Sequence, residues 1–475
     1  MVFSSVIFLF VFLPIFLLIY YLIPSKKTYL YKNIVLLMFS LLFYSFGEPI
    51  YILLMIFSSV VDYINGFMIN KYSDKKILKK LFLILSIIIN LSLLGFFKYS
   101  DFLINNINSI FDLSLNNLNI PLPIGISFFT FQTMSYSIDV YLGRVKYEKK
   151  FLNFMTYVCM FPQLIAGPIV RYETVSEELH NRSITYTKFN QGLIRFMFGL
   201  FKKVLIANNV GLLFKDISVL SQTELSFLLA WLGIVAYALQ IYFDFSGYSD
   251  MAIGMGKMLG FTYEENFNYP YISKSITDFW RRWHMSLSGF FKDYVYIPLG
   301  GSKTTRLKNV RNILVVWSLT GLWHGANWNF ILWGLYFGII LIIEKFLLKN
   351  ILSKMPNLFK HIYAILLILI GWALFSLSDI VYSKDYFFSL MGINTVFVNK
   401  KFVYYLINYG FVLIVGIILS IPIYPYLNKK LNSINNRVLE FILFIFIVII
   451  FIILFVITIS YLVSSTYNPF LYFRF

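Results

Sequence analysis

The sequence predicts an all-α polytopic membrane protein, and three observations carry this prediction. The 475 residues are 59% hydrophobic and only 13% charged, whereas a soluble domain is about half apolar and about a quarter charged. The mean hydropathy is +0.75. Long apolar runs alternate with short charged loops, as in chains whose helices span a bilayer, and not with the short alternating segments of a membrane barrel.

The formal net charge of +18 would suggest nucleic acid binding in a soluble chain. Here Lys and Arg gather in loops between apolar runs, as the positive-inside rule expects. We therefore assign the charge to topology and to anionic membrane lipids, and expect no nucleic acid partner. The single cysteine, Cys159, leaves no internal disulfide and no cysteine-based metal site.

The first apolar run, residues 5–23, is predicted to be a retained membrane span. No basic residue precedes it, and Lys26 and Lys27 follow directly. This order of charges is the reverse of that in a secretory signal peptide, and no small-residue cleavage site follows. The N-terminus is therefore expected outside the membrane.

Basic loops set the expected orientation of the next spans. Five lysines lie in "KYSDKKILKK", residues 71–80. Two apolar runs separate this loop from Lys26 and Lys27, so both loops fall on the cytoplasmic side. The next span exits, and the Asn-rich, lysine-free residues 104–120 suit the outer face. The spans predicted here are 33–46, 50–69 and 81–97.

Residues 121–143 are apolar but differ from an ordinary span. They start with Pro121 and Pro123 and contain Gln132 and Asp139. Prolines and polar groups at membrane depth are tolerated where they line a cavity, so a broken or re-entrant helix is expected. Residues 145–150 then return to the cytoplasm.

The rest of the chain continues as one membrane domain covering residues 1–475. Residues 274–311 are too charged to span, and we expect an amphipathic interfacial segment on the cytoplasmic side. About eleven spans plus one or two re-entrant pieces are predicted in all. The remaining spans lie near 151–167, 190–215, 226–245, 361–378, 403–424 and 439–463, the last leaving an extracellular tail to residue 475.

The stretch "GLWHGANWNF", residues 321–330, places His324 inside an apolar run. Such a histidine either hydrogen-bonds to a neighbouring helix or takes part in chemistry. Basic loops flank residues 312–343 on both sides, so the segment is expected to turn back within the membrane with His324 near the turn. A buried histidine without an acidic neighbour in sequence favours the neutral form that a general base needs.

A second candidate region is "DFWRRWHMSLSGFFKDYVYIPLGG", residues 278–301. Arg281 and Arg282 are suited to phosphates, and His284 is suited to reach a thioester or an acceptor. The alternative is an interfacial helix that only obeys the positive-inside rule. Charge by itself does not separate the two interpretations.

Two more segments carry polar residues. In residues 242–261, Asp244 and Asp250 either line a polar path or brace a helix, and we favour bracing because intramembrane polar groups also serve packing. In residues 161–172, Pro162 and Pro168 predict an irregular membrane segment.

Several chemistries lack their motifs. There is no HExxH and no Cys/His pair, so no metal site is expected. A P-loop and a G-x-S-x-G elbow are also missing, which disfavours an ATP motor and a serine hydrolase.

Five blocks of sequence, in order, resemble the membrane-bound O-acyltransferase family. They lie within residues 121–345 and are most similar to the bacterial branch that O-acetylates extracellular polysaccharides, as in alginate O-acetylation. The resemblance implies a helical membrane domain with a central tunnel, His324 as the catalytic histidine and His284 as the second characteristic histidine. The blocks are "LPIGISFFTFQTMSYSIDVY", "FPQLIAGPIVRY", "YFDFSGYSDMAIGMGKMLGF", the stretch 278–301, and "LTGLWHGANWNFILWGLYFG".

The tail "PFLYFRF" carries a further resemblance. In the related D-alanylation system of lipoteichoic acid, a one-span partner ends in a Phe-x-Tyr-Phe type motif whose tyrosine is implicated as an acyl carrier. The last span and tail, residues 439–475, resemble that partner fused to the chain, with Tyr472 at the matching position. The alternative, which we favour at this stage, is an aromatic anchor at the membrane interface.

The resemblance implies an O-acetyltransferase of the bacterial cell membrane with both termini outside. Acetyl-CoA or a similar short acyl thioester is the expected donor, with its phosphates near the cationic side chains, and no bound cofactor is expected. His324 would deprotonate an acceptor hydroxyl, while His284 would orient the donor or polarise its carbonyl. The donor residues are Arg281, Arg282 and Lys292, and the tunnel or supporting residues are Gln132, Asp244, Asp250, Trp323 and Asn327.

Other functions stay open at this stage. One is D-alanyl transfer to teichoic acid, although "IPLGGSK", residues 297–303, and the added C-terminal spans favour acetylation. A transporter or flippase would explain the polar groups without chemistry but would not turn over an acyl donor. A third is a scaffold for an extracytoplasmic acetyltransferase partner, and such a partner is expected in any case. Alginate, peptidoglycan, secondary wall polymers and exopolysaccharides all stay possible acceptors.

Overall fold

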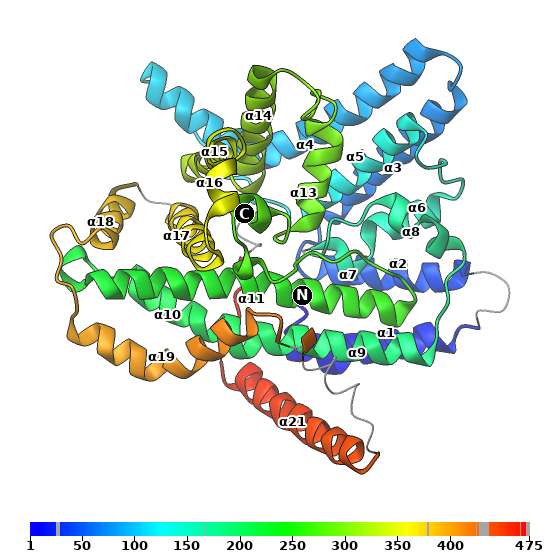
Figure 1. The fold of residues 1–475 in the computed structure, drawn as a ribbon. Coiled ribbons are helices and arrows are strands. Elements are labelled where there is room, and N and C mark those ends of the chain that lie inside the picture. Colours follow the sequence, from blue (N-terminus) through cyan, green and yellow to red (C-terminus); the bar gives the residue numbers. More distant parts are fainter. Residues whose placement is uncertain are drawn as a thin grey trace.

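Figure 1 shows a computed structural model of the protein. It describes residues 1–24, 29–165, 167–377, 380–423, 425–426, 437–465 and 467–471. Every regular element in these ranges is a helix, apart from a single bridge between Ser226 and Val396. The predicted all-α fold is confirmed.

The helices follow one another with short connections. In the first half they are η1 (Phe8–Phe12), α1 (Leu13–Leu22), α2 (Leu30–Ser45), α3 (Ile52–Lys71), α4 (Lys76–Phe111), α5 (Ile126–Leu142), α6 (Phe151–Cys159), α7 (Phe161–Leu164), α8 (Tyr172–His180), α9 (Tyr186–Phe201), η2 (Lys202–Ala207) and α10 (Asn208–Ser218). In the second half they are η3 (Gln222–Glu224), α11 (Phe227–Leu259), η4 (Pro270–Ile272), α12 (Ile276–Trp280), α13 (Met285–Phe291), η5 (Lys292–Tyr296), α14 (Arg306–His324), α15 (Trp328–Ile343), η6 (Glu344–Leu348), α16 (Lys349–Lys354), α17 (Asn357–Ser376), α18 (Ile380–Leu390), α19 (Lys400–Leu419) and α21 (Arg437–Ser464).

Eight helices in the described ranges are long and apolar enough to cross a bilayer, fewer than the predicted eleven. Two predicted spans, 5–23 and 33–46, form shorter apolar helices, Phe8–Leu22 and Leu30–Ser45. A third, 151–167, is interrupted at Met160, between α6 and α7. The eight are Ile52–Lys71, Lys76–Phe111, Tyr186–Ser218, Phe227–Leu259, Trp328–Lys354, Asn357–Ser376, Lys400–Leu419 and Phe441–Ser464.

The centre of the domain is a pair of long helices, α11 and the continuous segment α9–η2–α10 (Figure 1). They approach closely through glycines, because a Cβ on Gly199 would lie 2.4 Å from the carbonyl oxygen of Gly247. Asp250 of α11 accepts hydrogen bonds from Arg195 at 2.9 Å and from Lys202 at 2.7 Å. Close packing and ion pairs together therefore hold α11 against the segment α9–η2–α10.

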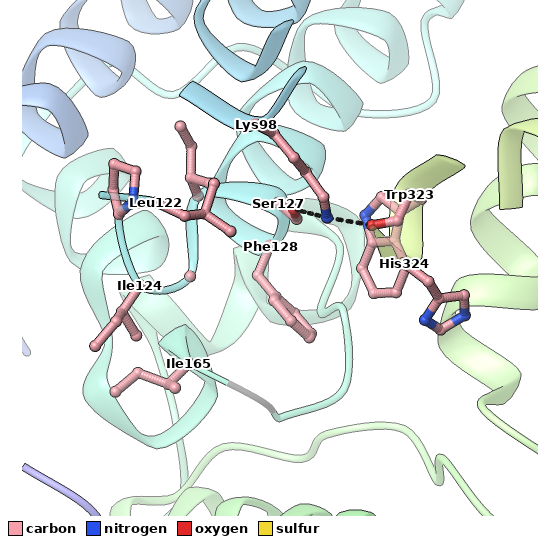
Figure 2. A pocket seen from close by; sticks show the side chains of 11 residues that line it. Lys98, Leu122, Ile124, Ser127, Phe128, Ile165, Trp323 and His324 are labelled. Atoms are coloured by element: carbon pink, nitrogen blue, oxygen red, sulfur yellow. Dashed lines mark hydrogen bonds between the residues drawn. The ribbon is translucent and has the colours of Figure 1, made fainter. Parts of the chain in front are cut away.

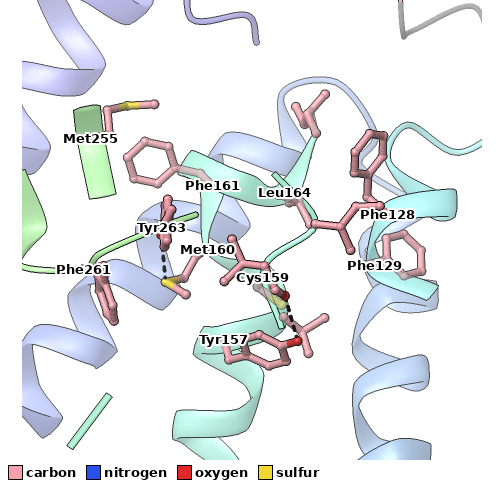
Figure 3. Close-up of a cluster of buried hydrophobic side chains, with 14 of the residues drawn as sticks. Phe128, Phe129, Tyr157, Cys159, Met160, Phe161, Leu164, Met255, Phe261 and Tyr263 are labelled. Atoms are coloured by element: carbon pink, nitrogen blue, oxygen red, sulfur yellow. Dashed lines mark hydrogen bonds between the residues drawn. The ribbon is translucent and has the colours of Figure 1, made fainter. Parts of the chain in front are cut away.

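An aromatic core fills the N-terminal half around α7. The ring of Phe161 lies 5.1 Å from Phe16, 5.4 Å from Phe12 and 5.5 Å from Phe43, centroid to centroid. Figure 3 shows this region, where the hydroxyl of Tyr263 donates to the sulfur of Met160 at 3.6 Å. The irregular segment predicted near Pro162 is present, because α7 ends at Leu164 after a single turn.

Two forms were expected for residues 121–143, a broken or a re-entrant helix, and the break is absent because α5 runs uninterrupted from Ile126 to Leu142. Pro121 and Pro123 lie in an extended segment before it, and α5 starts after Gly125, whose φ of +77° suits glycine. The polar residues of α5 are accommodated by burial against other helices. On α3, the carboxylate of Asp62 accepts from Ser137 of α5 at 2.8 Å and from Asn90 of α4 at 2.6 Å.

The predicted reversal within 312–343 is confirmed as a helical hairpin. α14 ends at His324, residues 325–327 turn, and α15 starts at Trp328. The two helices pack closely, since a Cβ on Gly334 would lie 2.3 Å from the carbonyl oxygen of Trp317. In Figure 1 this hairpin stands beside α13 and above α11.

The C-terminal helices pack on the outside of this centre. α17 contacts α15 and α11, α19 contacts α10 and α11, and α21 contacts α9 and η2. Lys401 at the start of α19 bonds to the carboxylate of Glu224 at 2.6 Å and lowers the pKa of that carboxyl to about 2. α21 is the most exposed of the long helices, with only 6% of its most apolar 18-residue stretch buried in the protein.

Candidate active site

His324 is the last residue of α14 and lies in an aromatic box. Its ring centroid is 5.0 Å from Trp323, 5.0 Å from Trp333 and 5.2 Å from Phe375. Only 4% of the residue is exposed. Gly321 makes this placement possible, because a Cβ there would lie 2.4 Å from the carbonyl oxygen of Phe330 on α15. The hairpin therefore holds the imidazole at its tip.

His284 reaches the same region from the α12–α13 segment. Its φ of +45° is rare outside glycine, and bonds on both sides hold this backbone. The amide of Met285 donates to the carbonyl of Asn266 at 3.0 Å, and the amide of Ser288 donates to the carbonyl of His284 at 3.1 Å. The His284 ring packs edge-on against Phe245 at 4.6 Å and lies 5.8 Å from Trp323.

The hydrogen bonds of Asn266 define the tautomer of His284. Oδ1 of Asn266 lies 3.1 Å from Nδ1 of His284 and also accepts from the backbone amide and the hydroxyl of Ser286, at 3.3 and 2.9 Å. A backbone amide only donates, so the Asn266 atom in this position is the oxygen. Nδ1 of His284 then carries the proton. Burial lowers the pKa of His284 to about 3, so the ring is neutral at ordinary pH and Nε2 carries the lone pair.

Both histidines line one large cavity of about 890 Å³. Its walls near the histidines are aromatic, with Trp280, Trp283 and Trp317 among them. Six cationic side chains also line it and supply a positive potential. They are Lys274, Arg281, Lys292, Lys345, Lys349 and Lys360.

Two of the three predicted donor residues, Arg281 and Lys292, line the large cavity, and Arg282 does not. Arg282 instead pairs with Asp278 one helical turn earlier, at 2.9 Å, and donates to the carbonyl of Asn268 at 3.3 Å. Adjacent arginines thus point into different surroundings.

Glu344 secures the segment that carries these residues. Its buried carboxylate accepts from the backbone amides of Ile276 and Thr277, at 2.7 and 2.8 Å, and from the Thr277 hydroxyl at 2.6 Å. The first turn of a helix has amides without intrahelical partners, and Glu344 satisfies two of them from the end of α15. α12 is therefore fixed against the hairpin.

A second cavity of about 550 Å³ begins where the hairpin turns. Gly325, Ala326 and the predicted Asn327 line it, together with Lys98 and Asp101 of α4. The large and second cavities have no lining residue in common. The turn after His324 therefore separates two spaces.

A small cavity of about 20 Å³ joins the two sets of lining residues (Figure 2). It shares His324 with the large cavity and Lys98 with the second cavity, and Trp323 and Ser127 also line it. The small cavity thus lies beside the large cavity at His324 and beside the second cavity at Lys98.

Asp244 lies near the second cavity and holds the C-terminal segment. It forms a buried ion pair with Lys203 at 2.6 Å, and its other oxygen accepts from the amide of Leu471 at 2.9 Å. Leu471 itself lines the second cavity. The ring of Phe470 packs tilted against that of Tyr248, with the centroids 4.3 Å apart. Tyr472 lies outside the described residues.

Gln132 is fully buried on α5, and neither amide atom has a hydrogen-bond partner among the described residues. It lines none of the three cavities. No group of three or more His, Cys, Asp or Glu side chains suited to a metal lies within the described ranges.

Sequence reasoning missed Asn266, Lys98 and the lysines near residue 345. Asn266 and Lys98 stand in segments without a motif, and only the fold brings them to the histidines. The cluster "EKFLLKN", residues 344–350, did stand out by charge, but its charge alone fitted a plain cytoplasmic loop.

Imidazoles that share a buried cavity are groups suited to general acid–base catalysis. The fold and the site together define a membrane-embedded enzyme. Residues 126–380 match the model of the membrane-bound O-acyltransferase family. The chain belongs to this family and is an O-acyltransferase.

Relatives span most of the chain. The probable alginate O-acetylase of Azotobacter vinelandii is 42% identical over 379 residues, covering 79% of this chain and 75% of the relative. The peptidoglycan O-acetyltransferase of Helicobacter pylori is 36% identical over 427 residues, covering 83% and 81%. The teichoic acid D-alanyltransferase of Bacillus subtilis is a more distant relative, 30% identical over 237 residues, covering 48% and 60%.

Proposed function

We propose that this protein moves acetyl groups from a thioester donor on the cytoplasmic side to hydroxyls of an extracytoplasmic polysaccharide. The observation that carries the proposal is the place of His324 at the tip of a hairpin, where it lines the large cavity while the turn that follows it lines the second cavity. The relatives named for acetyl transfer cover about four fifths of the chain, and the one named for D-alanyl transfer covers less than half. Acetyl is therefore preferred to D-alanyl.

The large cavity is the proposed donor site, and acetyl-CoA is the proposed donor. Coenzyme A carries several phosphates, and the six cationic side chains of the large cavity match that charge. The positive-inside rule favours the cytoplasm as the side on which these cations lie. The aromatic wall at Trp280 and Trp317 suits the thioester arm, which must leave water to reach His324.

In the proposed reaction, His324 removes the proton of the acceptor hydroxyl. The hydroxyl oxygen then attacks the thioester carbonyl carbon, and the resulting tetrahedral intermediate expels the thiolate. The proton held by His324 passes to that thiolate, so ester and free thiol are the products. General-base catalysis of this kind contributes about 10²–10⁴ in rate.

His284 is proposed to orient the donor rather than to polarise its carbonyl. Polarisation requires a hydrogen-bond donor, whereas Nε2 of His284 carries a lone pair once Asn266 holds the proton on Nδ1. A lone pair is suited to accept from an N–H of the donor arm or from the acceptor hydroxyl. Of the two roles predicted from the sequence, the first fits this geometry.

The second cavity is the proposed acceptor side. A polysaccharide hydroxyl reaches it directly or through a carrier, and Tyr472 is the proposed carrier. The support is that Leu471, the preceding residue, lines the second cavity. An extracytoplasmic partner that delivers the polymer fits this arrangement, as does a bacterial cell membrane with both termini outside.

The decisive experiment uses the purified protein in vesicles loaded with acceptor polymer. Acetyl-CoA with a labelled acetyl group is added, and two quantities are measured: the free thiol released and the label that enters the polymer. His324→Ala should abolish both, while His180→Ala, a half-exposed histidine bonded to Glu148, should leave both unchanged. Transfer at the wild-type rate in His324→Ala would remove His324 from the mechanism, and a wild type without donor turnover would overturn the proposal.

A further inference from the structure

Lys98 is a buried cation in a membrane-spanning helix that the proposed reaction does not use. It lies near the middle of α4, and only 9% of it is exposed. No carboxylate is among its hydrogen-bonding partners in the described residues. A charge in this position is costly unless it has a function.

The ammonium group of Lys98 binds the end of the catalytic hairpin. It donates to the carbonyl oxygen of Trp323 and, at 3.3 Å, to the hydroxyl of Ser127 (Figure 2). The next residue, Tyr99, donates its hydroxyl to the carbonyl oxygen of Leu322 at 2.6 Å. Consecutive residues of α4 thus bind consecutive carbonyls immediately before His324.

These carbonyls need partners from outside α14. The last four carbonyls of a helix have no intrahelical donor, and in a bilayer an unsatisfied carbonyl is expensive. The negative end of the helix dipole also favours a cation. Lys98 and Tyr99 therefore cap α14 from a neighbouring helix.

The same face of α4 continues along the turn. Phe102 packs its ring 5.8 Å from that of Trp328, and Asn106 accepts from the indole N–H of Trp328 at 3.0 Å. Residues 98, 99, 102 and 106 follow helical spacing, so one stripe of α4 contacts both sides of His324. The imidazole is held from outside its own hairpin.

We propose that Lys98 is a positioning residue for the acyl transfer, acting through the Trp323 carbonyl on the placement of His324. Tyr99 supports it at the adjacent carbonyl. This inference rests on the proposed role of His324. Lys98 lines the small and second cavities and not the large one, so its loss should affect the chemical step and not donor binding.

The test compares Lys98→Met, Lys98→Arg and Tyr99→Phe in the vesicle assay. Lys98→Met keeps an unbranched side chain, one heavy atom shorter, and removes the charge and the donors. We expect kcat to fall about 10- to 100-fold, because small misplacement of a catalytic group has effects of this size. KM for acetyl-CoA should stay within about twofold of wild type, well below the tenfold that a lost charged contact produces.

Lys98→Arg keeps the cation and should recover a large part of kcat, which a general packing defect would not allow. Tyr99→Phe removes one hydroxyl and should lower kcat severalfold at unchanged KM. It also serves as the deciding variant if Lys98→Met does not yield folded protein. Wild-type kcat in Lys98→Met, or in Tyr99→Phe where that variant decides, would overturn the inference. A rise in KM for acetyl-CoA as large as the fall in kcat would also overturn the inference.

The outcomes separate this inference from the proposed function. If His324→Ala abolishes transfer while Lys98→Met retains it, only the role of Lys98 is wrong. If His324→Ala retains transfer, the proposed base is wrong and the reason for positioning it disappears.

Discussion

Asn266 holds His284 in one tautomer through a hydrogen bond of 3.1 Å between Oδ1 and Nδ1. Both residues are 1% exposed, so water does not compete for this bond. The carbonyl oxygen of Asn266 thereby plays the part that a carboxylate plays in many catalytic pairs, without adding a charge. Nε2 is then the basic nitrogen of the His284 ring, and His284 lines the large cavity.

Replacing Asn266 should change the tautomer of His284 and the rate together. Asn266→Leu removes the acceptor, so no hydrogen bond from Asn266 favours the tautomer of His284 with the proton on Nδ1. We therefore expect kcat to fall about 10- to 100-fold. Asn266→Asp keeps an acceptor oxygen and should retain more activity than Asn266→Leu. Its carboxylate would raise the pKa of His284, so the acid limb of the pH–rate profile should move to higher pH.

The tautomer can be measured by ¹⁵N NMR on protein labelled at histidine. The chain has four histidines, and His284→Gln identifies the signals of His284. Wild type should give a protonated Nδ1 and a bare Nε2, whereas Asn266→Leu should shift this balance. A wild-type spectrum with the proton on Nε2 would refute the assignment and restore carbonyl polarisation as a role for His284.

The two neighbouring arginines provide a matched pair for the donor site. Arg281 lines the large cavity, while Arg282 pairs with Asp278. Loss of one charge-assisted hydrogen bond to a phosphate costs about 1.5 kcal/mol, so Arg281→Gln should raise KM for acetyl-CoA about tenfold. Arg282→Gln should leave KM near wild type.

Salt provides the second measurement for this prediction. The wild-type KM should rise with ionic strength because the cations and phosphates are screened, and the rise should be shallower in Arg281→Gln. Equal KM values for the two variants would show that the cavity-lining position of Arg281 has no bearing on donor binding.

The fold class could be predicted from the sequence because the bilayer sets the length of the apolar runs and the position of the basic loops. The reversal at His324 followed for the same reason, since two basic loops flanked a single apolar stretch of 312–343. Of the two forms expected for 121–143, broken or re-entrant, the break is absent because Pro121 and Pro123 precede α5, where a proline costs no helical hydrogen bond.

Contacts between segments that are distant in the sequence have no such pattern and could not be predicted. Lys98 and His324 are 226 positions apart, and Asn266 stands 18 positions before His284 in a loop without a motif. Periodicity reports which face of a helix is buried, but not which helix covers it. The cap on α14 and the tautomer of His284 therefore required the packed structure.

The buried ion pair of Lys203 and Asp244 gives a prediction about stability. It distinguishes the two roles considered for Asp244, which are to brace neighbouring helices or to line a polar path. Lys203→Met leaves the Asp244 carboxylate buried without its cation, which costs about 3–5 kcal/mol. The melting temperature in detergent should fall clearly. The double variant Lys203→Met/Asp244→Leu removes both charges and should recover much of that loss.

A polar path predicts a different pattern for the same variants. Transfer would then fail in the double variant as much as in the single one, with little change in melting temperature. Trypsin sensitivity of the tail adds a direct readout, because Asp244 holds the amide of Leu471 and Lys203 donates to the carbonyl of Pro469.

The last prediction concerns Tyr472 as the acyl carrier. Asp244 accepts a hydrogen bond from the amide of Leu471, the residue before Tyr472 in the sequence, and Leu471 lines the second cavity proposed for the acceptor. As a carrier, the phenolic oxygen of Tyr472 would take the acetyl group from the thioester while His324 takes the phenolic proton. A polysaccharide hydroxyl would then attack the acetyl group and displace the tyrosine oxygen.

Tyr472→Phe removes only that oxygen, and polymer acetylation should then fall by at least about 100-fold, the contribution expected of a nucleophile or its base. Tyr467→Phe, a change of the same kind in the same tail, should have no effect. Mass spectrometry of the C-terminal peptide after donor is added without polymer should detect acetyl on wild type and none on Tyr472→Phe. Full polymer acetylation by Tyr472→Phe would leave the tyrosine as an aromatic anchor and make the polysaccharide hydroxyl the direct nucleophile.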